Sequence, residues 1–175
     1  MRFTPIFVLA WWLALSPFAW ADPQIEIEGE WVYASIEISA PTARILELIR
    51  DPYAVAEVGG RGVVVVESIP TANGCTELEL LVPSALTRVR YREESCLTPA
   101  GRRSRLVQSR ELKRYESTWE VIEQGEGRPA LVRYNVRTAP TFPAPKALVA
   151  RITARSVRYM LTAIKARLEA GTNPA

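Results

Sequence analysis

Histidine is absent from this chain of 175 residues, and its only cysteines are Cys75 and Cys96. The missing imidazole removes the usual general base at neutral pH and a common zinc ligand. The cysteines form no Cys-x-x-Cys motif, so a zinc site or a thioredoxin-like redox site is excluded as well. We therefore expect no metal and no cofactor, and we favour binding over catalysis.

The chain also lacks a large excess of either positive or negative charge. The chain has 22 Lys and Arg against 19 Asp and Glu, and no basic block with interleaved aromatic residues. This balance argues against a nucleic-acid partner. Internal repeats, low-complexity tracts and linkers are missing too, so we expect a single domain over residues 22–175.

Residues 1–21 are expected to be a secretory signal peptide. Arg2 gives a positive start, residues 5–18 are apolar, and Ala19-Trp20-Ala21 fits a small-x-small cleavage site. The alternative is an uncleaved membrane anchor, but the apolar run is shorter than the roughly 20 residues of a span. The segment predicts that the protein is secreted. In a bacterium, we expect it in the periplasm.

The body of the chain reads mostly as strand, and its last stretch as one long helix. Residues 22–30 read as a polar lead-in, and two short helices are expected at 39–50 and 53–58. The valine-rich run within residues 62–69 is consistent with a central or well-covered strand. The strands are expected at 31–39, 62–69, 75–82, 87–97, 103–110, 117–124 and 130–139, and the long helix at 145–170.

Two registers compete in the hairpin formed by residues 75–82 and 87–97. One places Glu77 opposite Arg92 and Glu79 opposite Arg90, which pairs charges. The other places Glu79 opposite Arg92 and Cys75 directly opposite Cys96, as a cross-strand disulfide requires. In an oxidising compartment we favour the disulfide, and the alternative is two buried thiols.

The last hairpin carries the clearest strand signal. One register aligns Trp119 with Tyr134 on one face and Glu116 with Arg137 on the other. In the long helix, one apolar stripe recurs at steps of three and four. Its members are Val149, Ile152, Ser156, Met160, Ile164 and Leu168.

This order of elements resembles the helix-grip fold of the START-like superfamily, often called SRPBCC, nearest its polyketide cyclase and coenzyme Q-binding branch. The resemblance spans residues 31–168. The segments that carry it are 35–41, 48–53, Trp119-Glu120-Val121, Val132-Arg133-Tyr134, Phe142-Pro143 and Leu148, Val149 and Arg151. It implies an α+β fold in which a curved antiparallel sheet of about six to seven strands wraps around the long helix.

The resemblance also implies a cavity between the sheet and the helix. The alternative is that the same apolar residues form a packed core, as apolar stripes usually do. Three large aromatic side chains on one concave face favour a pocket for a small molecule. The residues expected to bind the ligand are Tyr53, Tyr91, Leu106, Trp119, Tyr134, Val136, Phe142, Val149, Ile152 and Met160.

Three polar side chains are expected on the inner face: Glu93, Gln108 and Arg110. A Glu93–Arg110 pair would orient a ligand head group or act as an acid–base pair. The alternative is a register error that leaves both in water.

These observations support three hypotheses for function. The first is a secreted carrier that binds a hydrophobic small molecule or lipid. The second is a cyclase- or dehydratase-like enzyme that acts on a hydrophobic substrate in the same cavity. The third is a module whose arginine-rich helix face makes transient contact with anionic lipid or docks to a partner.

Overall fold

The computed structural model describes residues 22–60, 62–83 and 88–170, so the predicted signal peptide lies outside the described residues. Over this range the chain has the predicted α+β architecture, with one long helix at its end. The elements are β1 (Gln24–Glu28), β2 (Trp31–Ile38), α1 (Thr42–Arg50), α2 (Pro52–Gly59), β3 (Val64–Pro70), β4 (Thr76–Pro83), β5 (Arg88–Thr98), β6 (Gly101–Ser109), β7 (Leu112–Ile122), β8 (Ala130–Pro140) and α3 (Lys146–Ala170).

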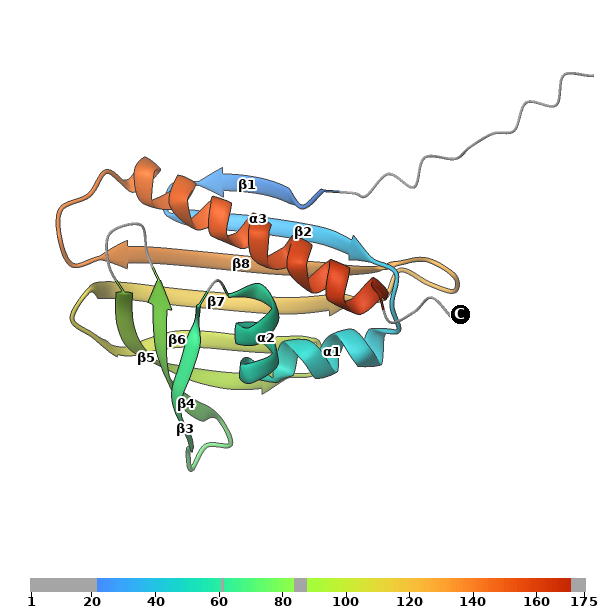
Figure 1. Ribbon diagram of the computed structural model, residues 1–175, viewed down its shortest axis with the longest axis horizontal. Coiled ribbons are helices and arrows are strands. Elements are labelled where there is room, and N and C mark those ends of the chain that lie inside the picture. Colours follow the sequence, from blue (N-terminus) through green and yellow to red (C-terminus); the bar gives the residue numbers. More distant parts are fainter. Residues whose placement is uncertain (1–21, 61, 84–87, 171–175) are drawn as a thin grey trace, which may run out of the picture.

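The strands form one antiparallel sheet in the order β1-β2-β8-β7-β6-β5-β4-β3. Figure 1 shows the three helices on the same side of this sheet, and β3 and β4 running steeply across the direction of β8. The sheet has eight strands, slightly more than predicted. The extra strand is β1, where Ile25 and Ile27 pair with Ala34 and Val32, in a segment that the sequence analysis took for a polar lead-in.

The valine-rich strand β3 lies at the edge of the sheet, so its prediction as a central or well-covered strand is wrong. Val64 and Val66 are about half exposed, whereas Val63 and Val65 pack on a small cluster around Leu78 and Leu80. A continuous apolar run carries no alternation, and an edge strand with one covered face therefore looks the same in the sequence as a central strand.

Both hairpin registers are resolved by the structure. In the last hairpin, Trp119 pairs with Tyr134 and Glu116 with Arg137, as predicted. In β4–β5, Glu79 pairs with Arg92, the second of the two registers considered. Cys75 and Cys96 form a disulfide with a Cα–Cα distance of 4.3 Å.

The two short helices are held by local contacts at Asp51. Its side chain accepts a hydrogen bond of 2.8 Å from the Tyr53 N–H and so caps α2, while Pro52 occupies the first turn. Just before it, Arg50 donates hydrogen bonds to the carbonyls of Thr98 and Pro99, at 3.0 and 2.8 Å. These bonds fix α1 to the turn between β5 and β6.

Helix α3 crosses the β1-β2-β8 part of the sheet (Figure 1) and is tied at both ends. Lys146 forms an ion pair with Glu30 at 3.0 Å. At the other end, Lys165 donates to the Glu37 carbonyl at 2.6 Å and the Ser39 N–H donates to Glu169 at 2.8 Å. No helix in the described part of the chain is both long and apolar enough to cross a membrane.

The predicted apolar stripe of α3 is correct only toward its end. Ile164 and Leu168 are buried, but Ile152 and Ser156 are exposed, and Val149 and Met160 are half-buried. The stripe that packs on the sheet is Ala150, Ala154, Val157, Leu161, Ile164 and Leu168. This stripe begins with the small residues Ala150 and Ala154, whereas the larger Ile152 and Met160 line a neighbouring cavity.

Candidate functional site

A cavity of about 540 Å³ lies between the sheet, α2 and α3. Most of its lining is apolar and comes from both the main core under α3 and the smaller cluster at β4 and β5. The lining consists of Pro52, Val55, Ala56, Gly59, Gly60, Val63, Leu78, Leu80, Val82, Pro83, Val89, Tyr91, Glu93, Arg102, Leu112, Tyr115, Trp119, Tyr134, Val136, Thr138, Ile152, Thr153, Arg155, Ser156, Val157 and Met160.

Four aromatic residues from β5, β7 and β8 form one wall of this cavity. The rings of Trp119 and Tyr134 are 4.2 Å apart between centroids, and those of Tyr91 and Tyr115 are 5.1 Å apart. The Tyr115 hydroxyl donates to Ser117 Oγ at 3.2 Å. Burial raises the pKa of all three tyrosines, so their hydroxyls stay protonated and can donate hydrogen bonds.

Polar side chains gather on the inner face of β5, β6 and β7. Glu93, Ser95, Arg102, Ser104 and Ser117 are all buried. Ser104 donates to Ser95 at 3.3 Å. Within the part of the chain that the structure describes, Nε and Nη1 of Arg102 are buried and lack hydrogen-bond partners.

The Glu93 carboxyl has a raised pKa. Burial is the main cause, and it is partly offset by the charge of Arg102 and by hydrogen bonding with Ser104 and Tyr115. Desolvation disfavours the ionised form of a carboxyl, while a nearby cation favours it. The cavity therefore contains one acidic group that takes up a proton more readily than a carboxyl in water.

The rim of the cavity combines α2 with the exposed middle of α3. A Cβ atom on Gly59 would lie 2.4 Å from Met160 Cγ, so the absence of a side chain lets α2 pack directly on α3. Ile152 and Arg155 are exposed, yet both contribute to the lining. The opening of the cavity therefore lies beside a surface with both apolar and basic side chains.

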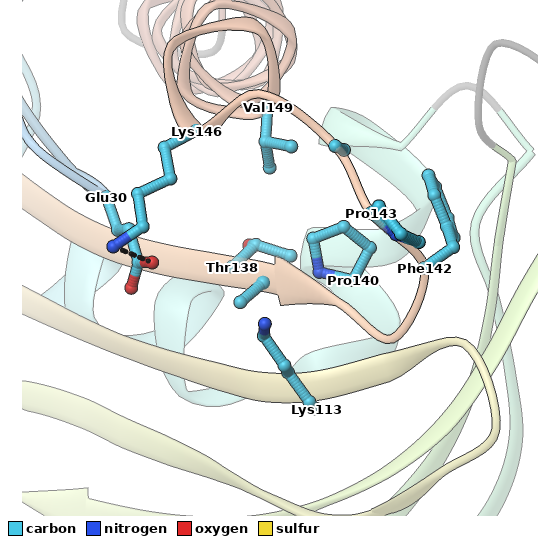
Figure 2. A pocket seen from close by; sticks show the side chains of 10 residues that line it. Glu30, Lys113, Thr138, Pro140, Phe142, Pro143, Lys146 and Val149 are labelled. Atoms are coloured by element: carbon cyan, nitrogen blue, oxygen red, sulfur yellow. Dashed lines mark ion pairs between the residues drawn. The ribbon is translucent and has the colours of Figure 1, made fainter.

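A separate hollow of about 130 Å³ lies where the chain turns from β8 into α3 (Figure 2). Its lining includes Phe142, Val149, Lys113 and the Glu30–Lys146 ion pair. Hydrogen bonding from Lys146 lowers the pKa of Glu30. The ion pair and the small volume indicate that this region fastens the start of α3.

No family model matches this chain, and no curated protein matches its sequence. Solved structures do match its fold. A START superfamily protein from Mycobacterium smegmatis has a TM-score of 0.69 at 17% identity, covering 82% of this chain and all of that one. A protein from Thermus thermophilus has a TM-score of 0.67 at 21% identity, covering 82% of this chain and 99% of the other.

The Zhui aromatase/cyclase from Streptomyces sp. R1128 has a TM-score of 0.51 at 19% identity, with 80% of this chain and 86% of that chain covered. The chain has the START-like fold. The architecture expected from the resemblance, a sheet that curves around a long C-terminal helix, is thereby confirmed.

Most of the residues predicted to bind a ligand face the cavity of this START-like fold, and four do not. Leu106 packs beside Tyr91 but is not part of the lining, and Tyr53 is exposed on α2. Phe142 and Val149 line the small hollow at the start of α3. The six that do line the cavity are Tyr91, Trp119, Tyr134, Val136, Ile152 and Met160, and the predicted polar residue Glu93 lines it as well.

Gln108 and Arg110 were predicted on the inner face, but both are exposed. Gln108 pairs with Arg92, whereas Glu93 pairs with Leu106, so Val107 is an extra residue in β6. Beyond such a β-bulge, the side chains of the strand that would have pointed to one face of the sheet point to the other face. Gln108 and Arg110, which follow Val107, therefore point to the opposite side from the one predicted.

Arg102, the buried cation of this START-like cavity, was not among the predicted site residues. The strand was expected to begin at residue 103, whereas β6 begins at Gly101. The signal was present, because Arg102, Ser104 and Leu106 share one face by simple alternation. Tyr115 was missed for the same reason, since β7 begins earlier than predicted.

Proposed function

We propose that this protein binds a hydrophobic small molecule or lipid in the cavity between the sheet, α2 and α3. The observation that carries the proposal is the cavity itself, about 540 Å³ in volume with a mostly apolar lining. Ligand pockets for small molecules commonly measure about 300–1,000 Å³ and combine apolar walls with a few polar groups.

Burial of apolar ligand surface would supply the affinity. It contributes roughly 25 cal/mol per Å² before the entropic costs of association. The aromatic wall offers broad contact at little cost in side-chain freedom, and the protonated tyrosines add donors. Structural neighbours include a START superfamily protein and an aromatase/cyclase, which supports a fold suited to hydrophobic ligands.

We place this activity outside the cytoplasm, in a bacterial periplasm. The support comes from residues 1–21, which have the composition of a signal peptide. The disulfide between Cys75 and Cys96 adds to it, because structural disulfides persist in oxidising compartments.

The test is to purify the protein from the periplasm under native conditions and to identify co-purifying compounds by mass spectrometry. We expect a stoichiometric hydrophobic compound. Thr153→Trp, which would fill the cavity, should lose it, whereas Thr162→Trp on the exposed side of the same helix should retain it. An empty extract from the natively purified protein, or equal amounts in both variants, would contradict the proposal.

A second function, docking to anionic membranes, is favoured by the outer face of α3. Leu148 and Ile152 are exposed there, beside exposed Arg151, Arg155 and Arg158. Glu169 is the only acidic residue of this helix and lies at its end. Apolar and basic side chains together on one exposed helix face suit an anionic lipid surface.

Removal of two of these charges tests the docking. Arg151→Gln with Arg158→Gln is expected to weaken binding to phosphatidylglycerol vesicles by about 2 kcal/mol, roughly thirtyfold, in a co-sedimentation assay. The matched control, Arg128→Gln with Arg133→Gln, removes the same charge from exposed sites elsewhere and should have little effect. Binding that is equally strong to neutral vesicles and insensitive to salt would rule out this function.

A further inference from the structure

Arg102 is a buried cation whose hydrogen bonds are incomplete. Its exposed fraction is 7%, and Nε and Nη1 have no hydrogen-bond partner among the described residues. A guanidinium does not lose its proton in a protein, so it cannot escape this cost by becoming neutral. A buried donor without a partner lowers stability, and a charged donor does so more than a neutral one.

Among the described residues, no oxygen of the strands around Arg102 accepts a hydrogen bond from these nitrogens. Its pairing partners are Leu97 on β5 and Trp119 on β7, both with apolar side chains. Glu93 is the one acidic residue of the cavity lining, and its charge interacts with that of Arg102. Among the described residues, however, no ion pair within 4.0 Å joins them, so a ligand could supply the missing acceptors.

The charges of the lining favour an anion. Among the described residues of the lining, Arg102 and Arg155 are cationic and Glu93 is the single carboxyl, so positive groups outnumber negative ones there. Arg155 is exposed at the rim, whereas Arg102 is buried. An amphiphile would therefore meet a cation at the opening and a second one inside.

We propose that Arg102 binds a carboxylate at one end of the ligand, whose apolar remainder contacts the wall formed by Trp119 and Tyr134. This inference rests on the proposed ligand-binding function and adds the chemical class of the ligand, an apolar acid. A carboxylate provides two acceptor oxygens and a compensating charge, and its hydrogen bonds to a guanidinium are about twice as strong as neutral ones. An alcohol of the same length provides an acceptor without the charge.

The first experiment compares three probes with the same chain on the unmodified protein: decanoate, methyl decanoate and decanol, each below its aggregation limit. Calorimetric titration at neutral pH is expected to show that decanoate binds at least about tenfold more tightly than the other two, as a charge-assisted bond implies. This comparison needs no variant, so it does not depend on how a mutation affects folding.

The second experiment repeats the titrations with Arg102→Gln and with Arg103→Gln. Arg103 is the next residue of β6 and is exposed on the opposite face, so its variant loses the same charge outside the cavity. We expect the preference for decanoate to vanish in Arg102→Gln and to persist in Arg103→Gln. Because two nitrogens of Arg102 have no hydrogen-bond partner to lose among the described residues, we also expect Arg102→Gln to unfold at no lower temperature than the ligand-free parent protein.

The outcomes separate this inference from the function on which it rests. Equal affinity for the three probes, or a preference for decanoate that survives Arg102→Gln, would overturn the carboxylate site alone. Failure of all three probes to bind would overturn it together with the proposed binding of apolar molecules.

Discussion

Replacement of Trp119 by alanine is expected to lower the free energy of unfolding by about 3–5 kcal/mol, the range for large aromatic residues in cores. Trp119 is 2% exposed, and its ring contacts that of Tyr134 at 4.2 Å between centroids. Truncation would also enlarge the existing cavity. The surrounding structure is not expected to collapse into the space, because β7 and β8 are each paired with a strand on both sides. Urea unfolding followed by circular dichroism measures the loss.

Trp31→Ala serves as the matched control. Trp31 is half-buried on β2, stacked on Tyr33 with the guanidinium of Arg137 above its ring. Because such a contact contributes about 1 kcal/mol or less near a surface, the loss should be much smaller. Equal losses in the two variants would show that Trp119 is not part of the core.

Loss of the disulfide is expected to lower the free energy of unfolding by about 2–4 kcal/mol. Cys75 and Cys96 are separated by 21 residues and join the outer ends of β4 and β5, so the bond restricts the unfolded chain across this whole hairpin. The variant Cys75→Ser with Cys96→Ser would be compared with the parent protein by urea unfolding, each with and without dithiothreitol.

The reductant provides the internal control. It should destabilise the parent protein to about the level of the double variant and leave the variant unchanged. Neither residue lines the cavity, so affinity for a bound ligand should change little where the double variant is folded. Unfolding curves of the parent protein that are identical with and without reductant would contradict a stabilising role for the bond.

The parts of the fold that the sequence predicted well are those with two independent constraints. In the last hairpin, the register that aligns Trp119 with Tyr134 also pairs Glu116 with Arg137, and the structure has both. In the β4–β5 hairpin, charge pairing alone left two registers open. Only the position of the cysteines distinguished them, and the structure has the register that they favour.

The remaining errors arise where alternation is absent or interrupted. The valine run of β3 has apolar residues on both faces, so nothing in it indicates an edge strand. The stripe on α3 was drawn through large side chains, but the stripe that is buried against the sheet includes Ala150 and Ala154. Small residues at a packing interface give little signal in a hydrophobicity pattern, although they decide which face is buried.

In the candidate site, too, the residues in regular strands were predicted and those at irregularities were not. The aromatic wall was predicted because Tyr91, Trp119 and Tyr134 share a face in strands whose pairing is readable. The polar end was predicted only at Glu93, because Arg102 lies at a strand boundary and Gln108 lies beyond an irregularity. Strand boundaries and bulges depend on tertiary packing, which local sequence does not specify.

The extra residue at Val107 has a bearing on how such proteins diverge. A single insertion or deletion in β6 would exchange inside for outside along the rest of that strand, and so alter the chemistry of the cavity without any substitution. Alignments that place gaps only in loops would then compare a cavity residue of one protein with a surface residue of another. For chains with this architecture, assignment of specificity from aligned positions requires the location of the bulge to be established first.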